Sequence, residues 1–149
     1  MGAIVAVERS HEDEEEVRLR LVARASNARL ARLTVTALAS RMAYSYDEIE
    51  DLRIAVGEVC GILFDAGADP SEQGDPGEQG PSSDPTDRVE VICTVTEEAL
   101  QVRTTRAAAH RTFEVTDLNR QILESVTDGV EFDLEPGSPS VTFTKQRRP

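Results

Sequence analysis

The clearest pattern of hydrophobic and polar positions lies in residues 45–66. Apolar side chains recur there at steps of three and four residues, which predicts one amphipathic helix. Ser45 followed by Glu48 predicts a capping box at its start, and Gly67 offers a left-handed stop after its end. The expected buried stripe is Ile49, Leu52, Ala55, Val56, Val59, Ile62, Leu63 and Ala66.

Two other patterns precede this helix. Residues 17–23 alternate between apolar and polar side chains, which predicts a half-buried strand. Residues 26–42 carry a helical stripe that follows Ser26 or Asn27, and either residue is a good N-cap. We expect this second helix to bury Leu30, Leu33, Ala37, Leu38 and Met42.

The second half of the chain predicts strand, strand, helix, strand, strand. Residues 89–95 and 100–104 alternate as the arms of a hairpin. Thr116 or Asp117 caps a short helix that Gly129 ends, and residues 130–134 and 141–143 alternate again. The whole order fits an α+β fold, a two-layer sandwich of a mixed, mostly antiparallel sheet with helices on one face.

Two segments have the composition of flexible chain. Residues 67–87 are rich in Gly, Pro, Ser and Asp, and we expect a disordered acidic loop there. Residues 1–16 combine a short apolar piece with an acidic run, and we expect a flexible N-terminal arm. Because neither half has enough core alone, residues 17–145 are expected to form one domain.

Composition narrows the class of protein. A net charge of −12 argues against nucleic acid as a partner, and no apolar run is long enough to span a membrane. The N-terminus lacks the pattern of a signal peptide, and Cys60 and Cys93 fall in apolar segments. We therefore expect buried thiols in a reduced cytoplasmic protein. His11 and His110 lack Cys partners at ligand spacing, so we expect no zinc site.

One stretch of this acidic protein is basic. Between residues 17 and 46 the chain has six arginines and no acid. Arg29, Arg32, Thr36 and Ser40 recur on one face of the predicted helix over residues 26–42. This face either keeps the helix soluble or docks a protein partner. Separately, the abundance of arginine and the single lysine in the sequence are associated with high-GC bacterial genomes.

Glu58 lies at the edge of the apolar stripe, where a carboxylate can simply be a solvated charge. The surrounding string, DEIEDLRIAVGEVC, resembles the first conserved helix of the anti-sigma-factor serine-kinase family of the GHKL (histidine-kinase-like) ATPase superfamily. Members of this family read roughly D-E-x-x-D-x-[KR]-x-A-[VL]-x-E-[AV]-x-[TS]-N-A. The resemblance implies the GHKL fold and makes Glu58 the general base toward a substrate serine. The matching residues are Asp47, Glu48, Asp51, Arg53, Ala55, Val56, Glu58 and Val59.

The chain departs from this family at its nucleotide site. The family's magnesium-ligating Asn corresponds to Ile62, whose hydrocarbon side chain has no lone pair. The family's Asp-x-Gly-x-Gly turn corresponds to RAAAH at residues 106–110, and its Gly-rich lid to TFEVTD at residues 112–117. Without glycine, the backbone cannot closely approach the phosphates. We therefore expect neither ATP nor magnesium as a cofactor, and Glu58 becomes a vestigial base.

The docking feature of the family is retained. The resemblance implies a sigma-contacting Arg in the first helix, and ASNARLAR fits that motif at Arg32. We therefore expect an anti-sigma factor that sequesters an alternative RNA polymerase sigma factor through Arg29, Arg32 and Thr36. An anti-anti-sigma antagonist would release it, and the resemblance leaves a homodimer open. The alternative is an active serine kinase that phosphorylates such an antagonist.

Overall fold

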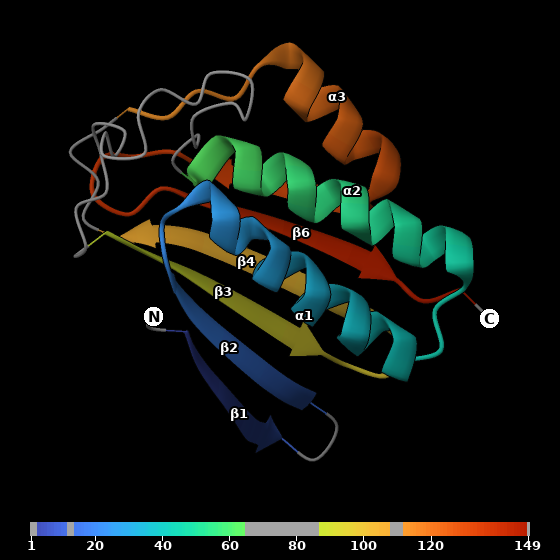
Figure 1. Cartoon of the computed structure of the whole chain (residues 1–149). Coiled ribbons are helices and arrows are strands. Elements are labelled where there is room, and N and C mark those ends of the chain that lie inside the picture. The colour runs from blue at the N-terminus through green and yellow to red at the C-terminus, as the bar shows by residue number, and fades with distance from the viewer. Residues whose placement is uncertain (1–2, 12–13, 65–86, 108–111, 149) are drawn as a thin grey trace.

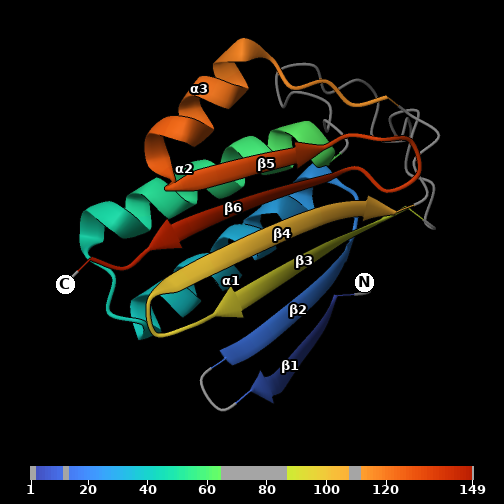
Figure 2. The same cartoon turned by 180° about the vertical axis from the view of Figure 1, so that it is seen from behind.

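The computed structural model describes residues 3–11, 14–64, 87–107 and 112–148. They form one six-stranded sheet in the order β1-β2-β3-β4-β6-β5 and three α-helices on one face of it (Figures 1 and 2). The elements are β1 (Ile4–His11), β2 (Glu14–Val22), the 3-10 turn η1 (Ala25–Asn27), α1 (Ala28–Arg41), α2 (Tyr46–Leu63), β3 (Arg88–Val95), β4 (Ala99–Ala107), α3 (Asp117–Val126), β5 (Gly129–Asp133) and β6 (Ser140–Gln146).

This arrangement confirms the expected α+β sandwich with helices on one face. Each neighbouring pair of described strands is antiparallel. Figure 2 shows the opposite face of the sheet, which no described helix covers. Alternation in β3 and β4 places Val89, Val91, Leu100 and Val102 inside, as the sequence pattern predicts. None of the described helices is long and apolar enough to cross a membrane.

The N-terminal segment differs from the flexible arm expected for residues 1–16. Residues 4–11 form β1, the edge strand, which pairs with β2 so that Val7 lies opposite Val17. The acidic run also contributes to β2, where Glu15 pairs with Arg41 at 2.6 Å. The alternation pattern did not reveal these residues because strands pair through backbone hydrogen bonds, and because Arg18 and Arg41 balance the charges of Glu16 and Glu15 in β2.

The buried face of α1 also differs from the expected stripe. Leu38 and Met42 are buried as expected, whereas Leu30 is 41% exposed, Leu33 is 53% exposed and Ala37 is also exposed. Small side chains let the helix lie close to its neighbours, and they displace the larger leucines toward solvent. Asn27 is the N-cap residue of α1, but its side chain makes no capping hydrogen bond. It donates instead to the Val22 carbonyl at 2.7 Å. The buried residues of the helix are Ala31, Val35, Leu38 and Ala39.

The central helix, α2, follows the sequence prediction closely. Its capping box is present, because the Glu48 amide donates to Ser45 Oγ at 3.1 Å and the Ser45 amide donates to Glu48 Oε1 at 3.4 Å. The helix ends at Leu63, since Phe64 has extended backbone, and the predicted stop at Gly67 lies outside the described residues. The stripe is confirmed from Leu52 to Leu63, whereas Ile49 is half-buried and Ala66 lies outside the described residues. The buried residues of the helix are Leu52, Ala55, Val56, Val59, Cys60, Ile62 and Leu63.

A buried lysine ties α2 and α3 to the sheet. Lys145 of β6 is 8% exposed, and its ammonium donates to Asp51 Oδ2 at 3.0 Å and to the Val126 carbonyl at 3.1 Å. The Tyr44 hydroxyl donates to the Lys145 carbonyl at 2.5 Å. Because a buried ammonium needs acceptors, these contacts hold the first half of α2 and the C-terminal end of α3 over β6.

The two cysteines provide a test of this core. Cys60 and Cys93 are free thiols, and burial raises the pKa of each from 9.0 to about 12, while Arg32 opposes that shift at Cys60. We expect neither thiol of the native protein to react with Ellman's reagent at pH 8, and both to react in denaturant.

The same shifts predict a pH dependence. The folded state binds the thiol protons more tightly than the unfolded state. Both thiols therefore add to the free energy of unfolding below about pH 9, and this contribution is lost as the pH rises from about 9 to about 12. Rapid reaction of the native protein with Ellman's reagent at pH 8 would contradict the burial of the two thiols.

Candidate functional site

Glu58 lies half-buried on the flank of α2 that faces α3. Its Oε2 accepts a hydrogen bond from Asn119 Nδ2 at 2.8 Å. Asn119 also caps α3, because its Oδ1 accepts the Thr116 amide at 3.0 Å and the Thr116 hydroxyl at 2.7 Å. The carboxylate is thus held beside the N-terminus of α3, where the helix dipole favours negative charge.

The position that would carry a magnesium ligand belongs to the core. Ile62 is 7% exposed and packs among the buried apolar side chains of α2 and the sheet. In the described part of the chain, no group of three or more His, Cys, Asp or Glu side chains could hold a metal. The contacts of Ile62 are therefore those of a core residue.

Arg106 stands at the end of β4, where the family resemblance implies an adenine-reading Asp. Its side chain is fully buried, and its guanidinium donates to the Leu63 carbonyl at 2.8 Å and to Asp87 Oδ2 at 2.7 Å. The guanidinium carbon lies 5.5 Å from the centroid of the Phe113 ring. Asp87, which we expected to belong to the flexible loop over residues 67–87, is therefore partly buried and paired with Arg106, whereas residues 65–86 lie outside the described residues.

Sequence reasoning missed Arg106, Asp87 and Asn119. One signal could have identified Arg106, because the inward alternation of β4 runs through Leu100, Val102 and Thr104 to position 106. A charged residue at such a position indicates a buried, paired guanidinium.

The expected docking residues lie together on α1. Arg29 and Arg32 are exposed, and the half-buried Thr36 donates its hydroxyl to the Arg32 carbonyl at 2.8 Å. Arg32 Nη1 lies 4.0 Å from where a Cβ on Gly57 would stand, so its guanidinium reaches α2 beside Glu58. No ion pair between described residues involves Arg29 or Arg32. We call Arg29, Arg32 and Thr36 the arginine face.

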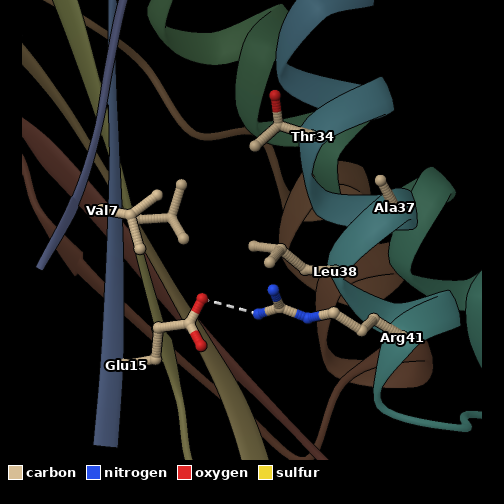
Figure 3. Close-up of a pocket in the computed structure, with 7 residues that line it drawn as sticks. Val7, Glu15, Thr34, Ala37, Leu38 and Arg41 are labelled. Carbon is tan, nitrogen blue, oxygen red and sulfur yellow. Dashed lines mark hydrogen bonds and ion pairs between the residues drawn. The ribbon is translucent and has the colours of Figure 1, made fainter. Parts of the chain in front are cut away.

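A second surface lies on the other flank of α1. A groove separates α1 from β1 and β2, and the Arg41–Glu15 ion pair crosses its end (Figure 3). The groove exists because the sheet extends past α1, which leaves Val5 and Val7 of β1 each 58% exposed. Its lining is Val7, Glu15, Val17, Thr34, Ala37, Leu38 and Arg41.

Comparisons with known proteins find likeness in sequence and in fold. No family model matches the chain. The chain is 39% identical over 46 residues to "Serine-protein kinase RsbW" of Bacillus thuringiensis (strain Al Hakam) and, equally, to that of Bacillus cereus (strain B4264). The match covers 31% of this chain and 29% of each relative, so the chain spans less than a third of these curated proteins in the alignment.

The fold has a solved counterpart. The chain aligns with a TM-score of 0.55 and 12% identity to the crystal structure of the RsbU and RsbW domains of Rv1364c from Mycobacterium tuberculosis. This alignment covers 89% of this chain and 33% of that one. At such low identity the likeness concerns the fold alone. Together, the two comparisons show a chain with local sequence similarity to RsbW serine-protein kinases and with the fold of part of Rv1364c.

Proposed function

We propose that this protein is an anti-sigma factor that binds a sigma factor by protein contact and does not use a nucleotide. The observation that carries the proposal is the arginine face, since Arg29 and Arg32 are exposed and have no carboxylate partner among the described residues. An unpaired guanidinium is suited to a carboxylate on a partner, because its planar fork makes two parallel hydrogen bonds.

The degenerate nucleotide site supports the same proposal. Phosphoryl transfer needs a metal and backbone donors around the phosphates. At the corresponding positions, Ile62 is a core residue and Glu58 is bonded to Asn119. The groups that would perform the chemistry instead stabilise the packing of α2 and α3. We therefore propose a pseudokinase that would act in transcription regulation, such as a stress response, within the cytoplasm.

An active serine kinase is the alternative. Two observations favour it: Glu58 is retained, and the relatives that match over 46 residues are named serine-protein kinases. In that case an anti-anti-sigma antagonist would be the substrate, whereas in the binding model it would be the protein that releases the sigma factor. Nucleotide binding separates the two functions.

The first prediction concerns ATP. A ligand that binds only the folded state, at a hundred times its dissociation constant, stabilises it by about 2.7 kcal/mol. We expect the melting temperature to be the same with and without millimolar Mg-ATP. Thermal melts of the full chain measure this, with a nucleotide-binding kinase of the same fold as a positive control. A rise of several degrees would favour the kinase.

The second prediction concerns Arg32. We expect Arg32→Ala to weaken sigma-factor binding by roughly 30-fold, which corresponds to about 2 kcal/mol at an interface hot spot. The melting temperature should change little, because Arg32 is exposed. The partner is first obtained by pull-down from the native cell, and the affinities are then measured by calorimetry.

Arg103→Ala is the matched control, since Arg103 is also exposed but lies on β4, away from the arginine face. Equal affinity of the two variants would remove Arg32 from the interface. A lower melting temperature of Arg32→Ala would give Arg32 a structural role instead.

We also propose a homodimer through β1. This strand is the edge of the sheet, and its exposed Val5 and Val7 leave an apolar surface beside an unpaired row of backbone groups. We expect sedimentation velocity to show a dimer for the unmodified chain and a monomer for Val7→Lys. A monomer at every concentration of the unmodified chain would contradict this proposal.

A further inference from the structure

Arg106 is the bulkiest of the fully buried side chains in the described part of the chain. Burying a guanidinium is costly unless the surroundings supply both charge and hydrogen-bond acceptors. Both are present here, because Asp87 contributes a carboxylate oxygen at 2.7 Å and Leu63 contributes a carbonyl oxygen at 2.8 Å. The Phe113 ring provides a third, aromatic contact at 5.5 Å.

These partners come from segments that are far apart in sequence. Leu63 is the last residue of α2, Asp87 precedes β3, and Phe113 lies in the segment before α3. The Arg106 amide also donates to the Pro139 carbonyl, 2.9 Å away, just before β6. A single residue of β4 therefore joins four other segments at one end of the sheet.

The contact with α2 has a further physical basis. The last carbonyls of a helix have no partners within the helix, and the helix dipole places partial negative charge on them. The guanidinium of Arg106 satisfies the Leu63 carbonyl and puts a full positive charge beside it. The same group reaches Asp87, so it bridges Leu63 and Asp87, which lie on either side of residues 65–86 in the sequence.

We propose that Arg106 is an internal ligand of this fold. Its guanidinium takes the place of a bound molecule at the end of β4, and it holds α2, β3 and the segment before α3 together without a nucleotide. The inference rests on the proposed absence of nucleotide binding. The cradle of carboxylate, carbonyl and aromatic ring defines the chemical class that it accepts, which is a planar guanidinium or amidinium cation.

The test removes the internal ligand and supplies it from solution. We expect Arg106→Ala to melt roughly 10 °C lower than the unmodified chain, because it leaves a cavity, an unsatisfied helix-end carbonyl and a partly buried carboxylate without its partner. Millimolar methylguanidinium should raise the melting temperature of this variant by several degrees, in a saturable way. It should leave the unmodified chain unchanged, and methylammonium, which has the charge but lacks the planar fork, should have no effect on either.

Two other variants keep the test decisive. Arg103→Ala removes an exposed arginine from the same strand and should melt like the unmodified chain. Arg106→Lys keeps the charge and loses the fork, so it should fold and melt several degrees lower than the unmodified chain; it carries the test if Arg106→Ala does not fold. The proposal is overturned if Arg106→Ala melts like Arg103→Ala, if a folded Arg106→Ala gains nothing from methylguanidinium, or if Arg106→Lys matches the unmodified chain.

The outcome is separable from that of the proposed function. Binding of Mg-ATP by the unmodified chain would contradict the nucleotide-free anti-sigma factor. Indifference of the melting temperature to substitution at Arg106 would contradict the internal ligand, whatever the affinity for a sigma factor.

Discussion

Burial of the inner face of α2 against the sheet is the constraint on which the rest of the structure depends. Because the hydrophobic effect is non-directional, it keeps α2 on the sheet but does not fix the orientation of the helices beside it. Polar groups provide that direction. Glu58 accepts a hydrogen bond from Asn119 of α3, and Asp51 accepts one from Lys145 of β6. The sequence of α2 thus specifies both its own burial and the positions of its neighbours.

These contacts also set what the molecule can do. A carboxylate that orients a helix is less available as a general base. A guanidinium in the core leaves less room for a nucleobase or a phosphate. Beside α3 and at the end of β4, side chains therefore satisfy one another, as Glu58 does with Asn119 and Arg106 with Asp87. On α1, Arg29 and Arg32 are instead exposed, and no ion pair between described residues involves them. In this way, the side chains that stabilise the packing are distinct from the exposed arginines of α1.

The sequence predicted the parts that depend on local pattern. The capping box and stripe of α2 and the alternation of β3 and β4 could be found because each repeats over several turns or pairs. The missed parts depend on distant partners. β1 forms because β2 offers an edge, and Leu30 is exposed because smaller residues of α1 face the core. Arg106 is buried because Asp87, 19 positions away, balances its charge.

The burial of Lys145 has a chemical consequence for the whole surface. It is the single lysine of the sequence, and its ammonium is enclosed by Asp51 and the carbonyl of Val126. Acetyl transfer and amine-reactive crosslinkers need an accessible lysine amine, and that of Lys145 is buried. The exposed cationic side chains among the described residues are arginines, so lysine acetylation would leave their charge unchanged while the fold is intact.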